Sequence, residues 1–227
     1  MKETLNRAKN LELETRWIEE GDNHVYTSID TPVNNGKLLM SDESKITTIE
    51  FHFRKIMEVL GLDLNDDSLS GTPHRVAKMY VEEIFKGLVP KNKPKISTFE
   101  NKYGYNAILL EKNISFHSFC EHHFLPIEGV AHVAYIPNEK VIGLSKINRI
   151  VNYFAQRPQV QERLTRQIAN EMREVLETES VAVLLSARHM CVSARGIKDL
   201  SSSTTTSEFS GAFLNEDRKQ EFYKQIA

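Results

Sequence analysis

The sequence predicts an α+β fold in which helices pack on one face of an antiparallel sheet. Apolar side chains follow helical spacing after residue 41, and short β-type apolar runs begin after residue 107. Two further helical stretches separate the first of these runs from the later ones. Segregation of helical and strand patterns indicates α+β architecture, whereas regular alternation would indicate a parallel sheet.

The chain divides by pattern into three parts. Residues 1–40 are polar and end near Pro32 and an Asn-Asn-Gly turn signal, so we interpret them as a peripheral extension. Residues 41–90 are expected to form an N-terminal helical segment. Residues 91–227 are expected to form the main domain, which contains the strands.

Capping residues and prolines place the helices. Ser41 can cap a helix that ends at Gly61, and Thr72, followed by a proline, can cap a second helix. Pro90 closes this second helix. Three more helices are expected at residues 145–157, 158–178 and 216–225.

Strands are expected where apolar and β-branched residues form short runs. The Ser/Thr-rich stretch at residues 201–207 fits a linker and an edge strand equally well. The runs cover residues 108–110, 114–116, 130–136 and 181–185, and another strand is expected to begin at 191–194.

Composition excludes several classes of protein. The chain has 227 residues, of which 40% are hydrophobic and 26% charged, as is typical of a globular protein. Its net charge of −2 gives no general attraction to nucleic acid or to an anionic membrane, and no apolar run is long enough for a membrane span. The N-terminus lacks the apolar core of a signal peptide, so we expect a cytoplasmic protein whose two cysteines are free or metal-bound.

The densest cluster of reactive residues contains both cysteines. Cys120 and His123 stand three positions apart at the end of a predicted strand, and His189 and Cys191 follow far along the chain. Zinc prefers thiolate and imidazole, and a site with three protein ligands leaves a position for water. A zinc site and a pair of inert buried thiols both fit these residues, a disulfide fits less well, and the adjacent His122 favours the metal. The spacing does not match the P-C-x-x-C signature of nucleobase deaminases.

A second group of residues could bind an anion. Ser145 is expected to open a helix, where free N–H groups and the helix dipole favour negative charge. Lys146 and Arg149 share one face of that helix. Arg195 and Arg75 are further candidates, although a solvated basic face also fits these residues. No G-x-x-x-x-G-K-[ST] motif occurs, so phosphate transfer is not indicated.

Glu162 is a candidate for recognising a guanine base. A carboxylate can accept hydrogen bonds from the N1–H and the amino group of guanine, which would select guanine over adenine. A first-turn glutamate that only complements the helix dipole also fits this position.

Five sequence runs together resemble the GTP cyclohydrolase I family. They occur in the order and at the distances found in that family, and the similarity extends from about residue 45 to residue 215. The runs are GTPHRVAKM at residues 71–79, CEHH at 120–123, VIGLSK at 141–146, QRPQVQERLT at 156–165 and HMC at 189–191.

The resemblance implies a tunnelling-fold subunit that assembles into a homodecamer, two pentamers face to face, with active sites between subunits. It implies that residues 91–227 form the catalytic domain and that Cys120, His123 and Cys191 bind zinc. The implied reaction is hydrolysis of GTP at C8 of the imidazole ring with release of formate. Rearrangement of the ribose and ring closure then give 7,8-dihydroneopterin triphosphate, in the first step of tetrahydrofolate and pterin biosynthesis.

The resemblance also implies roles for residues around the substrate. His189, together with His122, would move protons as the ring opens. Glu162 with Gln161 would hold the guanine. The ribose and triphosphate would be bound by Ser145, the neighbouring backbone at Leu144, Lys146, Arg149, Arg195 and, from an adjacent subunit, Arg75.

One position departs from a pattern seen in the family, and two other functions stay open. Ser193 stands where some members carry a basic residue, which bears only on affinity for triphosphate.

A nitrile reductase acting on a deazaguanine shares the fold, but it uses a cysteine nucleophile and NADPH and needs no Cys-His-Cys metal set. A non-catalytic scaffold would hold a structural zinc with a fourth ligand, His122 or Glu121.

Overall fold

The computed structural model describes residues 28–34, 36 and 39–227. The chain separates into two compact units, Met1–Pro32 and Val33–Ala227, and every element described below belongs to the second. Most of the extension predicted at residues 1–40 lies outside the described residues. Within the described ranges, no helix combines the length and the apolar character that crossing a bilayer requires.

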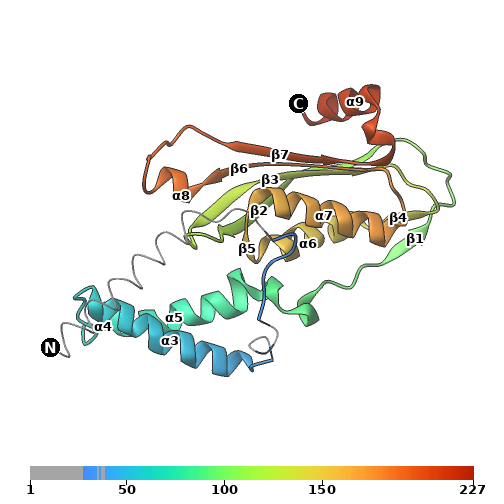
Figure 1. Ribbon diagram of the computed structural model, residues 1–227. Coiled ribbons are helices and arrows are strands. Elements are labelled where there is room, and N and C mark those ends of the chain that lie inside the picture. Colours follow the sequence, from blue (N-terminus) through green and yellow to red (C-terminus); the bar gives the residue numbers. More distant parts are fainter. Residues whose placement is uncertain (1–27, 35, 37–38) are drawn as a thin grey trace. The chain divides into compact units, whose positions relative to one another are not determined.

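A five-stranded sheet, in the order β5-β2-β3-β6-β7, forms the centre of this unit (Figure 1). Neighbouring strands run antiparallel except β5, which is parallel to β2. A separate two-stranded sheet pairs β1 with β4. The strands are β1 Thr98–Glu100, β2 Leu109–Cys120, β3 Pro126–Tyr135, β4 Lys140–Ile142, β5 Pro158–Gln159, β6 Val181–His189 and β7 Thr204–Phe209.

The central strand β3 pairs along its length with both β2 and β6. Phe119, near the end of β2, is opposite Pro126 at the start of β3. His189, the last residue of β6, is opposite Ile127. The end of β2 and the end of β6 therefore meet on either side of the first residues of β3.

Helices cover both faces of the sheet. The helices α6 (Leu144–Ala155) and α7 (Gln161–Leu176) bury their apolar sides against one face, in the larger apolar core. The C-terminal helix α9 (Glu216–Ile226) packs Phe222 against the opposite face (Figure 1). The expectation of helices on one face is therefore correct for α6 and α7 but omits α9. Inner strands that carry apolar residues on both faces need cover on both, and Ala134, Ala182 and Leu184 are buried under α9.

The N-terminal helical segment differs from its prediction in the second helix and in the cap of that helix. The helix α3 (Asp42–Val59) begins as expected, and the Ser41 hydroxyl accepts a hydrogen bond from the Ser44 N–H. The second predicted helix instead breaks into several short pieces. They are α5 Thr72–Met79, a π-helical turn Tyr80–Ile84 and a 3₁₀ turn at Lys86–Leu88. The short helix α4 (Asp67–Ser70) precedes them, and a 3₁₀ turn at Pro90–Asn92 follows.

The cap of α5 is also different. Gly71, not Thr72, occupies the N-cap position, and no side chain caps the helix. The Thr72 hydroxyl accepts a hydrogen bond from the Arg75 guanidinium instead.

Three other expectations need correction in the strand region. The two runs at residues 108–116 form the single strand β2, whose register with β3 shifts between Glu111 and Ile114. The helix expected at 158–178 begins only at Gln161, because Pro158–Gln159 pairs with β2. The strand expected at 191–194 is the short helix α8 (Met190–Ser193). Short apolar runs do not distinguish helix from strand by periodicity.

The other two predictions in this region are resolved or confirmed. The Ser/Thr-rich stretch forms β7, the edge strand, rather than a linker. The C-terminal helix expected at residues 216–225 is confirmed as α9.

Gly87 joins the helical segment to the main sheet and its helices. Its N–H donates to the carbonyl of Gln156, just after α6, at 3.0 Å. A Cβ at this position would lie 2.2 Å from the Tyr153 carbonyl oxygen and 2.7 Å from that of Gln156. Both obstacles are backbone atoms, so only glycine allows this close contact.

Substitution of Gly87 by alanine should therefore destabilise the protein. We expect Gly87→Ala to lower the free energy of unfolding by about 2–3 kcal/mol, since the added carbon forces two backbone segments apart. Urea unfolding followed by circular dichroism measures this change. Gly104→Ala is the control, because its added Cβ meets nothing within 4 Å and costs only the strain of a φ of 61°. Equal losses in the two variants would contradict the close contact.

Candidate metal centre and active site

The side chains of Cys120, His123 and Cys191 converge at one end of the sheet. One ligand atom from each lies within 4.8 Å of the others. A tetrahedral zinc ion, with bonds of about 2.0–2.3 Å, would hold such atoms roughly 3.5–3.8 Å apart, so small side-chain movements would complete the site. Cys120 is buried, Cys191 is partly buried and His123 is exposed, so the cluster is open on one side.

The sheet register explains this convergence. Cys120 ends β2, and His123 lies in the turn that leads into β3. Cys191 lies in α8, directly after the end of β6. Because β3 pairs with both strands, the turn and α8 are brought to the same end of the sheet.

Backbone hydrogen bonds shape the turn at residues 120–125. The Cys120 N–H donates to the Leu125 carbonyl and the Phe124 N–H to the Cys120 carbonyl, each at 2.8 Å. The N–H of Glu121 donates to the Gln159 carbonyl in β5 at 3.0 Å. The turn places the His123 Nδ1 atom 3.9 Å from the Cys120 Sγ atom, and the Nδ1 of His122 lies 3.7 Å from the same sulfur.

A buried arginine holds the turn from the helical side. Arg163, on α7, donates from both terminal nitrogens to the Glu121 carboxylate, at 2.7 and 3.1 Å. Arg163 is only 4% exposed. The paired geometry is strong and directional. The carboxylate of Glu121 is therefore engaged by Arg163. Among the described residues, the group of mutually close candidate ligands includes neither Glu121 nor His122.

The second nitrogen of His123 faces an arginine. The Arg195 Nη1 atom lies 2.6 Å from the His123 Nε2 atom. A guanidinium can only donate, so Nε2 accepts in this contact. The Nδ1 atom is the one that faces the sulfur of Cys120.

His189 is held by the side-chain amide of Gln161. The two N–H groups on the Gln161 Nε2 atom face three acceptors, the carbonyls of Leu185 and Thr204 and the hydroxyl of Thr206, at 3.3, 2.9 and 3.1 Å. These bonds fix the amide orientation, and its Oε1 lies 2.7 Å from the His189 Nε2. Since Oε1 only accepts, Nε2 of His189 carries a hydrogen in this contact.

Burial shifts the pKa of two groups at the site. Burial lowers the pKa of His189 below its ordinary value, and the charge of Glu162 opposes this shift. Burial raises the pKa of the Cys191 thiol, and the neighbouring Cys120 raises it further. Both shifts reflect the cost of placing charge away from water.

The remaining predicted residues lie on the helices α5, α6 and α7. The N-cap of α6 is Gly143, without a side-chain cap, so the helix begins one residue before Ser145. The Glu162 side chain is exposed on the first turn of α7. The Arg75 guanidinium donates to Thr72 and to the Ser68 carbonyl within its own helical segment. On α6, Leu144, Ser145 and Arg149 are exposed, and the Lys146 ammonium donates to the Lys95 carbonyl.

The structure therefore brings together some of the predicted site residues and leaves others apart. The residues that come together lie around the three candidate ligands. Arg75 and Lys146, in contrast, contact neighbours elsewhere. Sequence reasoning missed Arg163, because nothing in its spacing marks a pairing with a residue in a distant turn. The residues brought together are Cys120, His122, His123, Cys191 and Arg195, with His189 at the end of β6 and Gln161 at the start of α7.

Two thiols, an imidazole and further polar side chains lie at one end of the sheet of this α+β fold, and this is the composition of a catalytic metal site. Known proteins of one family resemble this chain over most of its length. The GTP cyclohydrolase I family profile matches residues 49–227. A GTP cyclohydrolase 1 of Flavobacterium johnsoniae is 54% identical over 92% of this chain and 93% of its own length.

Other relatives carry the same name. A GTP cyclohydrolase 1 of Aeromonas salmonicida is 54% identical over 81% of this chain and 84% of its own length. One of Citrobacter koseri is 50% identical over 89% of this chain and 91% of its own length. The chain belongs to the GTP cyclohydrolase I family and is an enzyme.

The buried ion pair yields a prediction about stability. Glu121→Gln should lower the free energy of unfolding by about 3 kcal/mol, because the Arg163 guanidinium stays buried after its carboxylate is lost. Urea unfolding of the metal-free protein measures the change. In the double variant Glu121→Gln, Arg163→Met, much of the loss should be recovered. Glu128→Gln, at an exposed position on β3, is the control. If Glu121→Gln destabilised the protein no more than Glu128→Gln, the role of the ion pair would be contradicted.

Proposed function

We propose that this enzyme hydrolyses GTP at C8 of the imidazole ring and releases formate. Rearrangement and ring closure then yield 7,8-dihydroneopterin triphosphate, the first step of tetrahydrofolate and pterin biosynthesis. The observation that carries this proposal is the convergence of Cys120, His123 and Cys191 in a chain of this family. The compartment expected from composition, the cytoplasm, stays a prediction.

Zinc is the metal that fits the three ligands best. Two thiols and an imidazole form a soft, nitrogen- and sulfur-rich donor set, which zinc prefers over the oxygen-rich sets of magnesium and calcium. When bound by three protein ligands, zinc acts as a Lewis acid and lowers the pKa of water to about 7. Cys120, His123 and Cys191 would hold it.

His189 is assigned the main proton transfer. Its Nε2 hydrogen is directed at the Gln161 Oε1 atom, so Nδ1 is the ring atom that can accept a proton and return it. The buried hydrogen bonds of Gln161 keep the imidazole in this tautomer. His122, whose ring lies beside Cys120, is the second candidate for proton transfer.

Glu162 is assigned the recognition of guanine. Its exposed carboxylate stands on the first turn of α7, next to Gln161, and can accept from the N1–H and the amino group together. The side chain of Gln161 already bonds to His189 and three other groups. Gln161 therefore contributes by linking the position of Glu162 to that of His189.

The first turn of α6 is assigned the ribose and triphosphate. The backbone N–H groups of Leu144 and Ser145 lie where no side chain caps the helix, and the helix dipole favours an anion there. Lys146 and Arg149 add positive charge on the same helix. Arg195 and, from an adjacent subunit, Arg75 would complete the triphosphate contacts.

This assignment calls for self-association, because Arg75 and Lys146 contact neighbours away from the candidate metal ligands. We propose a tunnelling-fold subunit, with residues 41–90 as its helical segment and 91–227 as its catalytic domain, that forms a homodecamer of two pentamers with sites between subunits. Several apolar side chains on α3 and just after it are exposed to solvent, and such a group is suited to burial against another subunit. They include Phe51, Ile56, Val59, Leu60 and Leu62.

Formate release tests the proposed reaction. Zinc-loaded protein incubated with GTP should release one formate per GTP and form a product with pterin absorbance. Cys120→Ala should remove both zinc and activity, since it deletes one of three ligands. No formate from a folded, zinc-loaded assembly would contradict the reaction, and would favour the nitrile reductase or the scaffold instead.

The role of Glu162 has a separate test. Glu162→Gln should lower kcat/KM for GTP roughly 10- to 100-fold, because a charged hydrogen-bond acceptor is replaced by a neutral amide. Bound zinc, measured by atomic absorption, should not change. Glu174→Gln, an exposed position on the same helix, should keep full activity. Near-normal turnover by Glu162→Gln would rule out this recognition.

A further inference from the structure

The ring of Phe85 lies between two phenylalanines that flank the candidate metal ligands. Phe119 directly precedes Cys120, and Phe124 directly follows His123. The Phe85 ring contacts both edge to face, with centroids 5.4 Å from Phe119 and 5.3 Å from Phe124. One side chain from the N-terminal helical segment thus touches both ends of the stretch that carries two ligands.

The π-helical turn places Phe85 in this position. The N–H of Phe85 donates to the carbonyl of Tyr80 at 3.1 Å, and the Tyr80 ring packs against the Phe85 ring at 5.4 Å. Two residues later, Gly87 is bonded to the carbonyl of Gln156 without room for a side chain. Turns of this type are rare within helices and occur frequently at functional sites.

Phe124 has a strained backbone conformation, which its N–H bond to the Cys120 carbonyl and the ring contact with Phe85 both support. Its φ of 52° lies in the left-handed region, which a bulky side chain adopts only when its surroundings hold it there. The residue is 48% exposed, so few other groups restrain its ring. The ring contact with Phe85 is the one ring contact of Phe124 within the described part of the chain.

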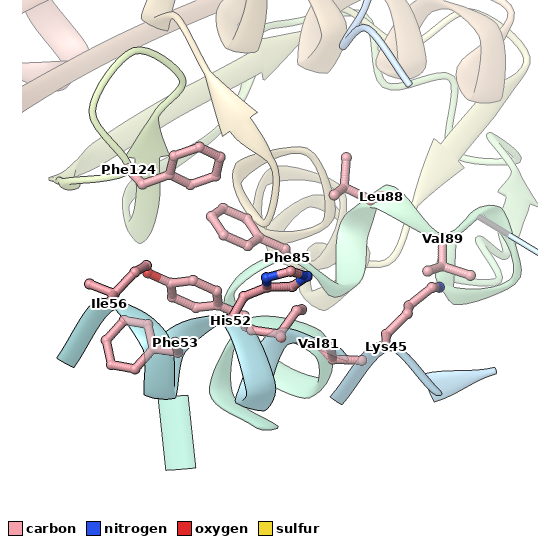
Figure 2. Close-up of a pocket in the computed structure, with 11 residues that line it drawn as sticks. Lys45, His52, Phe53, Ile56, Val81, Phe85, Leu88, Val89 and Phe124 are labelled. Atoms are coloured by element: carbon pink, nitrogen blue, oxygen red, sulfur yellow. The ribbon is translucent and has the colours of Figure 1, made fainter. Parts of the chain in front are cut away.

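An open cavity borders the rings of Phe85 and Phe124, so no other side chain fills the space beside their contact. It has a volume of about 480 Å³ and lies between α3, the π-helical turn and Phe124. Figure 2 shows the rings of Phe85 and Phe124 next to each other, with Phe53 and Ile56 of α3 on the far side of the cavity. If the Phe85 ring is removed, Phe124 can relax into this space.

We propose that Phe85 is a positioning residue for the metal centre, which fixes the distance between the ligand atoms of Cys120 and His123. The inference rests on the metal site of the proposed function. Relaxation of Phe124 to a negative φ rotates the peptide that follows His123 and moves its imidazole away from Cys120. Phe85 therefore acts on metal affinity and geometry through the turn, without touching the metal.

Metal affinity and cobalt spectra test this role without relying on activity. Phe85→Leu should weaken zinc binding about 10-fold or more, measured by competition with a chromogenic chelator, as loss of an outer-shell partner does elsewhere. The visible spectrum of the Co²⁺-substituted protein should lose intensity, because the tetrahedral geometry is distorted. Phe85→Tyr, which keeps the ring, should restore both. Phe53→Leu, which trims a ring in the same cavity away from the turn, is the matched control.

A second variant separates positioning from general packing. Phe124→Asn removes the ring but tolerates a left-handed backbone, so the conformation of this residue no longer depends on Phe85. In this background Phe85→Leu should weaken zinc binding clearly less than in the wild-type protein, since only the contact with Phe119 remains to be lost. This cycle also serves if Phe85→Leu alone is poorly folded.

The outcomes distinguish this inference from the proposed function. Unchanged zinc affinity and cobalt spectrum in Phe85→Leu would overturn the inference and leave the metal site intact. An equal loss in Phe53→Leu, or an undiminished loss in the Phe124→Asn background, would also overturn it, because either would indicate packing alone. If the wild-type protein binds neither metal in one-to-one ratio, the proposed metal site itself fails.

Discussion

Pairing of β3 with both β2 and β6 is the constraint on which the candidate site depends. His123, in the turn after β2, and Cys191, after β6, are 68 positions apart in the sequence. Ile127, near the start of β3, nevertheless pairs with both strands, opposite Ser118 of β2 and His189 of β6. Register in a sheet that is buried on both faces resists slippage, because a one-residue shift would exchange the side chains facing α7 and α9. The sheet register therefore fixes the strand ends from which the turn and α8 carry the ligands.

The turn that carries Cys120 and His123 is held by three elements of different chemistry. The backbone of β5 accepts from Glu121, the guanidinium of Arg163 on α7 binds the carboxylate of the same residue, and the ring of Phe85 packs on both flanks. A short turn with a left-handed phenylalanine is not stable by local preference alone. The surrounding supports let the protein keep two ligands close together at a position that remains open to solvent.

Much of the architecture could be predicted from the sequence, and the failures have physical causes. The periodicity of α6, α7 and α9 and the β-branched runs of the inner strands are local signals, and they identified these elements to within a few residues. The two-residue strand β5 and the π-helical turn depend on contacts with distant segments, so local pattern could not show them. The C-x-x-H spacing indicated that Cys120 and His123 could approach one ion, but the bond between Arg163 and Glu121 spans 42 positions and has no sequence signature.

The contact at Gly87 bears on how such a protein could be divided or recombined. Sequence pattern changes near residue 90, yet residues 33–227 form one compact unit. Gly87 lies so close to the backbone after α6 that this junction has no space for a different side chain. A shortened protein that began at residue 91 would keep Cys120, His123 and Cys191 but lose the ring that packs beside them. The helical segment is therefore not an exchangeable module, and any homologous replacement would have to carry over the junction as well as the helices.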